Sequence, residues 1–301
     1  MTPVASGKSS HRWACLLGLP LGHSLSPAMH NAAFARLAVD AHYELREVDA
    51  DKLPSAVDSL RDPSCLGANV TAPYKEAVMA LLDDLLPVAR TLGAVNTIIC
   101  RSGKLLGDNT DAEGLARWME RAGITVHAQR ALVLGAGGAA RAAVLALARH
   151  RAQSIRVLNR SVERADMLVA DLQRHLPGTL LDAGRLAEAA EPARAPVALV
   201  VNATSLGHHG RAPSVHSSWY GPGAVAVELV YNPPETEFMR SARAAGARAE
   251  NGLGMLIHQA VLAFERWTGQ MPPVDLYEET AGQALRDAWQ ASPVVTHGAG
   301  Q

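Results

Sequence analysis

Apolar and polar positions along the chain follow two alternating patterns: short apolar runs typical of buried strands, and longer segments with helical spacing. In the first half these patterns predict strands at 13–17, 43–48, 67–70 and 94–100, and helices at 27–37, 53–60, 74–86 and 111–122. In the second half they predict strands at 131–134, 154–158, 197–201, 224–230 and 247–250, and helices at 139–150, 162–176 and 255–267. Segments 183–196 and 207–223 have the composition of loops, and the last dozen residues that of a frayed tail. The alternation predicts an α/β protein with parallel or mixed sheets and helices on their faces.

The composition narrows the class of protein. With 301 residues, of which 48% are hydrophobic and 19% charged, the chain has room for about two domains and is not intrinsically disordered. The 28 basic and 29 acidic residues give a net charge of −1, which argues against a nucleic-acid partner. The three cysteines lie far apart without a CxxC pair. We therefore expect neither a zinc site nor a disulfide framework, and a reducing cytoplasm fits best.

Membrane and export signals are weak. No apolar stretch reaches the roughly 20 residues that a membrane span needs. The run at 13–17 follows basic residues and bears a faint likeness to a signal peptide, but it is short and is interrupted at Gly18 and Pro20. We interpret it as a buried first strand.

A glycine loop separates the strand at 131–134 from the helix that follows. Gly135, Gly137 and Ala140 match the pattern G-x-G-x-x-(G/A). In that pattern the first glycine permits a tight turn, the second lets the backbone approach a pyrophosphate, and the small third residue lets the helix pack close to the strand. The helix N-terminus then offers free N–H groups to the anion. On this motif alone, an ordinary turn between a strand and a helix remains an alternative.

The end of the next strand favours one dinucleotide over the other. An acid that binds the NAD ribose is usual there, but this chain has Asn159 and Arg160 at the strand end, with Arg164 four residues later. That spacing brings both guanidinium groups to one side of a helix start. Because a guanidinium binds phosphate in a fork, the pair favours NADP over NAD.

Polar residues also cluster after the strands of the first half. Ser24 and Ser26 can together hold a carboxylate, although Ser26 is also a natural helix N-cap. Lys75 lies near a predicted helix start, where a lysine is uncommon because that end already carries positive dipole charge. Asn96 interrupts an apolar strand, and Asp111 precedes a helix that it could cap. Each cluster alone also fits a capping or surface role.

The order of these clusters resembles the shikimate dehydrogenase family from about Leu16 to Trp267. The motifs that carry the resemblance are 23–27 with 30–31, 69–71 with 73 and 75, 93–97, 109–111, 135–139, 159–160, 202–207, 231–233, 252–256 and 259. Several rare motifs in one order are more specific than any single motif. The chain departs from the family pattern at Asp108, where an aromatic residue is common, at Ala112, where glycine is frequent, and at Glu228, which is often aspartate.

The resemblance implies a reversible, NADPH-linked reduction of 3-dehydroshikimate to shikimate, a step toward chorismate and the aromatic amino acids. It implies a substrate-binding α/β domain, 1–111 with 253–301, and a Rossmann-like NADP-binding domain, 112–252. It also implies the roles of individual residues. Lys75 and Asp111 would be catalytic; Ser24, Ser26, Thr71, Asn96, Tyr231 and Gln259 would bind substrate; Gly135, Gly137, Gly138, Ala139, Asn159, Arg160 and Arg164 would bind NADP.

Several expectations accompany this assignment. No metal is needed, the location is cytoplasmic, and the protein is a monomer or homodimer. Two alternatives stay open: a quinate/shikimate dehydrogenase that uses NAD, and a non-catalytic sensor on the same fold.

Overall fold

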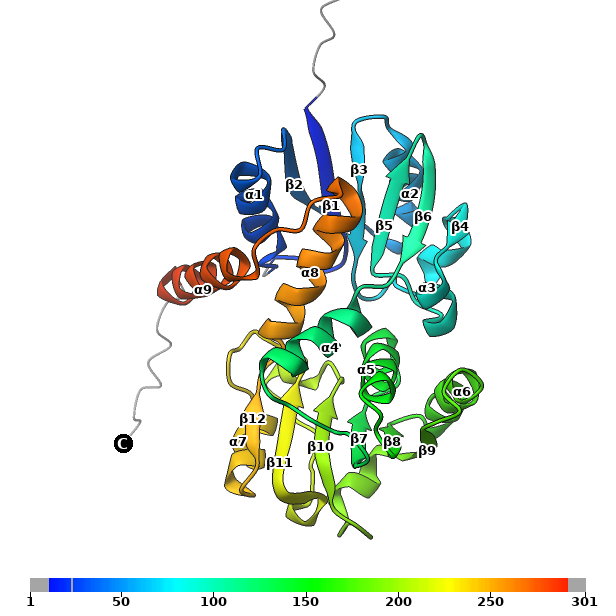
Figure 1. Ribbon diagram of the computed structural model, residues 1–301, viewed down its shortest axis with the longest axis vertical. Coiled ribbons are helices and arrows are strands. Elements are labelled where there is room, and N and C mark those ends of the chain that lie inside the picture. Colours follow the sequence, from blue (N-terminus) through cyan, green and yellow to red (C-terminus); the bar gives the residue numbers. More distant parts are fainter. Residues whose placement is uncertain (1–10, 23, 292–301) are drawn as a thin grey trace, which may run out of the picture.

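The first of two sheets is built from the N-terminal third of the chain. The computed structural model describes residues 11–22 and 24–291 (Figure 1). Its first sheet has the order β2-β1-β3-β5-β6-β4, with β5 antiparallel to β3 and β6 and the other neighbours parallel. Its elements are β1 (Arg12–Gly18), α1 (Ser26–Arg36), β2 (Ala41–Glu47), α2 (Leu53–Asp58), β3 (Cys65–Val70), β4 (Asp84–Leu85), α3 (Pro87–Leu92), β5 (Thr97–Arg101) and β6 (Lys104–Asp108).

The second sheet is entirely parallel, with the order β12-β11-β10-β7-β8-β9. Its elements are β7 (Arg130–Leu134), α5 (Gly138–Arg149), β8 (Ser154–Asn159), α6 (Val162–Gln173), β9 (Leu180–Arg185), β10 (Val197–Asn202), β11 (Tyr220–Glu228), α7 (Glu237–Ala244) and β12 (Arg248–Glu250). This is the doubly wound order of dinucleotide-binding sheets. The strand order reverses between β7 and β10, so ligands are expected beyond the carboxyl ends of those two strands. The predicted α/β fold with two units is confirmed.

Two helices connect the units, α4 (Asp111–Arg121) and α8 (Leu253–Thr268), and they cross where the sheets meet (Figure 1). Glycine allows their backbones to touch. A Cβ atom on Gly114 would lie 2.6 Å from the backbone nitrogen of Gln259, and one on Gly254 would lie 1.9 Å from Nε1 of Trp118. This close crossing brings one face of α8 to the start of α4.

The C-terminal part of the chain returns to the first sheet. Phe264 and Trp267 on α8, and Tyr277 on α9 (Val274–Ala291), share a core with Leu16 of β1 and Phe34 of α1. One face of the first sheet is therefore covered by residues from the far end of the sequence. Among the helices of the described residues, none combines the length and apolarity that crossing a membrane requires.

The helix predicted at 74–86 is wrong. Residues Ala77–Leu81 form a 3₁₀ turn, β4 follows, and α3 begins at Pro87. A proline disfavours helical geometry in the residue before it but suits the first turn of a new helix. In addition, the Asp83 carboxylate accepts from the backbone N–H of Leu105 at 2.7 Å, which ties this segment to β6.

Other elements were not predicted. The sequence patterns missed β6, β9, α7 and α9, and the predicted loop at 207–223 includes the start of β11. Most of the predicted C-terminal tail lies outside the described residues.

Candidate active site

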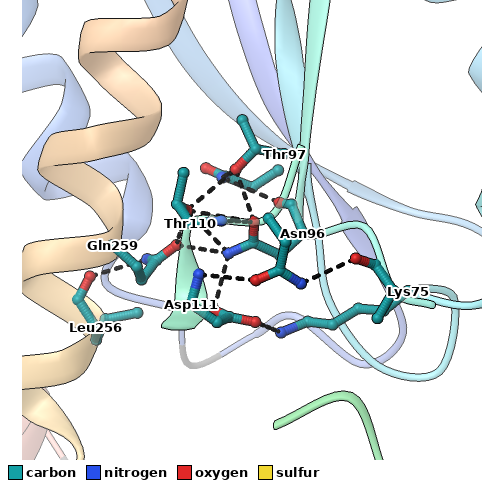
Figure 2. Close-up of polar contacts among 10 residues, drawn as sticks. Lys75, Asn96, Thr97, Thr110, Asp111, Leu256 and Gln259 are labelled. Carbon is teal, nitrogen blue, oxygen red and sulfur yellow. Dashed lines mark hydrogen bonds and ion pairs between the residues drawn. The ribbon is translucent and has the colours of Figure 1, made fainter. Parts of the chain in front are cut away.

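The centre of the site is an ion pair between the two predicted catalytic residues. Lys75 lies in the turn after β3, and Asp111 is the first residue of α4. Lys75 Nζ donates to Asp111 Oδ2 at 2.5 Å (Figure 2). The lysine side chain is 20% exposed and the aspartate 6%. The structure thus brings together two residues that are 36 positions apart and leaves the ammonium within reach of solvent or substrate.

The Asp111 carboxylate is held from its other side. Asn96 Nδ2 donates to Asp111 Oδ1 at 2.8 Å, and the backbone N–H of Asp111 donates to Asn109 Oδ1 at 3.0 Å (Figure 2). Asp111 therefore does not cap α4 as the sequence also allowed; Asn109 accepts from the helix start instead. Both carboxylate oxygens therefore bond to side chains, Oδ1 to Asn96 and Oδ2 to Lys75.

Gln259 reaches the same cluster from α8. Its Oε1 accepts from Asn96 Nδ2 at 3.2 Å, and its Nε2 donates to the backbone oxygen of Leu256 at 2.8 Å (Figure 2). Thr110, which the sequence analysis gave no role, donates its backbone N–H to Asn96 Oδ1 at 2.7 Å. Asn96 is thus the hub that orients the aspartate and the glutamine.

The serine loop lies before α1. Ser26 is buried and begins α1, and its backbone N–H donates to Ser24 Oγ at 3.3 Å. The prediction that Ser26 caps the helix with its side chain is therefore wrong, because Ser24 accepts at this position. Ser24 is half-buried, and His23 of the same motif lies outside the described residues. Thr71, also half-buried, follows β3 and anchors its backbone N–H on the oxygen of Leu17 at 2.9 Å.

Buried polar side chains connect the serine loop to the ion pair. The Ser26 side chain contacts the Tyr43 phenol, and Tyr43 donates to Asn69 Oδ1 at 2.8 Å. Asn69 Nδ2 in turn donates to the backbone oxygen of Asn96 at 3.2 Å. Tyr43 was missed because a single aromatic residue in a predicted strand carries no signal of a polar role.

The second unit contributes Tyr231 from the loop after β11. Its phenol oxygen meets the backbone N–H of Leu25, inside the serine loop. Burial raises the pKa of this phenol, so the group stays protonated. The tyrosine therefore joins the second unit to the loop that carries Ser24 and Ser26.

The glycine loop has the shape that a dinucleotide diphosphate requires. Gly135 has φ +110°, and a Cβ atom there would lie 3.0 Å from the backbone oxygen of Ala203. Beside Gly137, by contrast, the space is open, and α5 begins at Gly138 with no acidic residue in its first turn. Ala139 follows within that turn. An open helix N-terminus with free N–H groups fits an anion.

The glycine loop also lies beside Lys75. A Cβ atom on Gly138 would lie 3.4 Å from Cδ of Lys75. The stem of the lysine therefore lies close to the start of α5, separated from Gly138 by the space that a Cβ atom would fill. Lys75 of the first unit is thus next to the glycine loop of the second.

The predicted ribose-phosphate residues lie together at the end of β8. Asn159 Nδ2 donates to the backbone oxygen of Ser161 at 2.9 Å, and Arg160 and Arg164 are exposed. No acidic residue was expected beside these arginines, but Glu163 lies in the same turn. Its carboxylate accepts from Ser161 Oγ at 2.6 Å, and this hydrogen bond lowers its pKa. Both guanidinium groups are exposed and can meet a phosphate.

Among the described residues, 11–22 and 24–291, no three His, Cys, Asp or Glu side chains are grouped to hold a metal ion. The three cysteines are buried and free. A doubly wound sheet, a glycine loop at its switch point and a lysine–aspartate pair against that loop define a dinucleotide-dependent oxidoreductase.

Comparison with known proteins gives the family. The chain matches the shikimate dehydrogenase substrate binding domain over residues 16–98, shikimate / quinate 5-dehydrogenase over 118–193 and the shikimate 5'-dehydrogenase C-terminal domain over 252–281. It is 44% identical over 276 residues to the shikimate dehydrogenase (NADP(+)) of Symbiobacterium thermophilum, covering 90% of this chain and 93% of that protein. The chain belongs to the shikimate dehydrogenase family.

Two solved structures have the same architecture. The shikimate 5-dehydrogenase of Thermus thermophilus in complex with NADP(H) and shikimate is 38% identical, with a TM-score of 0.79 and coverage of 91% of this chain and 100% of that chain. The ligand-free 5-ketofructose reductase of a Gluconobacter strain is 31% identical, with a TM-score of 0.79 and coverage of 90% and 98%. The same fold therefore occurs in proteins that are named for different substrates.

Proposed function

We propose that this protein catalyses the reversible, NADPH-linked reduction of 3-dehydroshikimate to shikimate. The observation that carries the proposal is the Lys75–Asp111 ion pair, whose lysine lies against the glycine loop at Gly138. A ketone that accepts a hydride develops negative charge on its oxygen, so a hydrogen-bond donor or cation must lie beside that oxygen. Lys75 is such a cation, and Asp111 holds it in place.

The cofactor's part is simple: NADPH, when bound, supplies the hydride. The residues that hold it are Gly135, Gly137, Gly138 and Ala139 at the diphosphate, and Asn159, Arg160 and Arg164 at the 2′-phosphate. The presence of two exposed arginines, each with a guanidinium group that can bind phosphate in a fork, supports NADP over NAD.

The chain's own groups bind and orient the substrate. Lys75 donates a proton to the ketone oxygen during reduction and receives it during oxidation, while Asp111 fixes the position of Nζ. The ring hydroxyls of the substrate hydrogen-bond to the buried amides of Asn96 and Gln259 and to the hydroxyl of Thr71. The substrate-binding set is completed by Ser24 and Ser26 at the carboxylate and by Tyr231 beside them.

We assign residues 1–111 and 253–301 to the substrate-binding domain and residues 112–252 to the NADP-binding domain. The two sheets and the crossing of α4 and α8 support this division. We also propose that the protein works in the cytoplasm, since its three cysteines are free and buried. We further propose that it is a monomer or homodimer.

One assay tests the proposal against its alternatives. Purified protein is given shikimate or quinate, each with NADP or NAD, and reduction of the dinucleotide is followed; 5-ketofructose with NADPH is a further arm because of the related reductase. We expect shikimate with NADP to give the highest kcat/KM. A higher kcat/KM for quinate with NAD would favour the quinate enzyme, and a higher kcat/KM for 5-ketofructose would favour a sugar reductase. No turnover in any arm would favour the non-catalytic alternative.

A further inference from the structure

Glu228, the last residue of β11, is a carboxylate that the mechanism does not use. Its side chain is fully buried, with an exposed fraction of 0%. It accepts hydrogen bonds from Asn202 Nδ2 at 2.9 Å, from Thr236 Oγ1 at 3.0 Å and from the backbone N–H of Val230 at 3.2 Å. All three partners are neutral donors. Burial raises the pKa of this carboxyl, and the hydrogen bonds oppose that shift.

The first partner, Asn202, is next in the chain to Ala203, which packs on the glycine loop. Asn202 Oδ1 accepts from both the backbone N–H of Thr204 at 3.1 Å and its hydroxyl at 2.8 Å. The neighbouring Ala203 donates its N–H to the oxygen of Leu134 at 2.8 Å and packs on the glycine loop at Gly135. The loop that begins after β10 therefore lies beside the glycine loop at the switch point of the sheet, where a dinucleotide-binding crevice is expected, and the Asn202 amide sets its first turn.

The other partners lead to the substrate side. Val230 immediately precedes Tyr231, whose phenol meets the amide of Leu25 in the serine loop. Thr236 ends the same segment and caps α7, accepting from the N–H of Met239 at 3.4 Å. One carboxylate therefore fixes both ends of the segment that carries Tyr231, and it also fixes the loop at the crevice.

We propose that Glu228 is a positioning residue: it holds the loop 202–204 at the dinucleotide crevice and Tyr231 at the serine loop in one fixed arrangement. The proposal rests on the proposed function for the identity of the substrate, but not for its effect on NADP binding. In this arrangement, the direction of the hydrogen bond between Glu228 and Asn202 decides the geometry of the loop at the crevice.

The test begins with Glu228→Gln. The new amide keeps the size of the side chain but has one oxygen and one NH₂ group, whereas both oxygens of Glu228 accept hydrogen bonds. With the NH₂ group at the Oε2 position, either the Asn202 amide turns over and releases Thr204, or two donors face each other. With the NH₂ group at the Oε1 position, it faces the N–H of Val230, next to Tyr231. Because hydrogen bonds to charged groups are worth about 10- to 100-fold in an equilibrium constant, we expect the Kd of NADP+ to rise about 10-fold by calorimetry without substrate. We expect kcat with shikimate to fall by a similar factor.

A reciprocal exchange separates positioning from loss of stability. In the double variant Glu228→Gln/Asn202→Asp, the new amide donates to the new carboxylate and to the Thr236 hydroxyl, while its oxygen accepts from Val230. The new aspartate still accepts from Thr204. We expect the Kd of NADP+ and kcat to return to within about 3-fold of the parent protein, whatever the thermal midpoint of the double variant.

The outcomes are decisive in either direction. Parent values of Kd and kcat in Glu228→Gln, with only a lower thermal midpoint, would overturn the proposal, and so would a double variant no better than the single one. If Glu228→Gln does not fold, Thr204→Val replaces it: an NADP+ Kd raised about 3-fold supports the proposal and an unchanged Kd overturns it. If the parent protein does not oxidise shikimate, the proposed function fails, while the Kd measurements still decide the role of Glu228.

Discussion

Replacing Lys75 by methionine separates the catalytic role of the ion pair from its structural role. Lys75→Met keeps the length of the stem that lies against Gly138 and removes the charge. Asp111 Oδ2 then loses its donor at a position where the side chain is only 6% exposed. Loss of a hydrogen bond to a charged group costs about 1.5–3 kcal/mol, so the free energy of unfolding should fall by about that amount. General acid help is worth about 10²- to 10⁴-fold, so kcat should fall by that factor.

The second perturbation removes the other charge. Asp111→Asn keeps the bond from Asn96 to the Oδ1 position but points an NH₂ group at Lys75 Nζ, so the lysine loses its partner. We expect kcat to fall by a similar factor of about 10²–10⁴. The double variant has no uncompensated charge. Its stability loss should be about 1 kcal/mol smaller than the sum of the two single losses, while its kcat should be no lower than that of either single variant.

The assay follows NADPH absorbance at saturating shikimate and NADP, and urea unfolding gives the stability. The matched control is Lys52→Met, which breaks another lysine–aspartate contact, 2.9 Å long, but between exposed side chains. That variant should keep the parent kcat and change the free energy of unfolding much less than Lys75→Met does, because solvent screens exposed ion pairs. Near-normal kcat in Lys75→Met, or losses in kcat that multiply in the double variant, would refute the reasoning that the two residues act as one unit.

Four further predictions follow from single contacts. Arg160→Ala should raise the KM for NADP about 10- to 100-fold and leave that for NAD nearly unchanged, because a charge-assisted contact to the 2′-phosphate is lost; equal losses for both cofactors would contradict this assignment. Ser24→Ala should raise the KM for shikimate with little change in that for NADP, and an unchanged shikimate KM would remove this serine from the carboxylate site. Gly254→Ala should lower the free energy of unfolding by about 1–3 kcal/mol in urea and shift Trp118 fluorescence, since the new Cβ overlaps the indole. An unchanged free energy of unfolding would show that α8 can move away from α4 without cost. Burial lowers the pKa of His30 to about 3, so the unfolded chain binds a proton below pH about 6.5 that the folded chain does not. The free energy of unfolding should therefore fall as the pH drops from about 6.5 toward 3, by about 1.4 kcal/mol per pH unit from this group, and His30→Phe should flatten that profile.

Residues whose chemistry is local could be predicted from the sequence. The glycine loop between β7 and α5 is determined by a turn, an open helix N-terminus and small residues in a row, all of which are written in consecutive positions. The pair of Lys75 and Asp111 was predicted through the order of motifs, and the structure places the two side chains in contact. Their substrate and cofactor roles stay predictions.

Residues whose environment comes from distant parts of the chain could not be predicted. Asp108 was noted only as a departure from the family pattern, yet its carboxylate is 1% exposed and pairs with Arg266 of α8 at 2.9 Å. Glu228 was set aside in the same way. The single helix predicted at 74–86 failed because apolar spacing alone cannot show where a segment is tied to a neighbouring strand. In each case a tertiary contact decides what the local pattern leaves open.

The return of α8 and α9 to the first sheet has a consequence for synthesis on the ribosome. Translation delivers the strands of the first sheet early, but Phe264, Trp267 and Tyr277, which share its core, emerge only after the whole second sheet. The parallel sheet of β7–β12, by contrast, has all its strands between residues 130 and 250. Domains generally fold as units during translation, N-terminal first. Here the order is reversed: the unit that is begun first is completed only after the second one, and its bare apolar face must be kept from aggregating until α8 and α9 have been made.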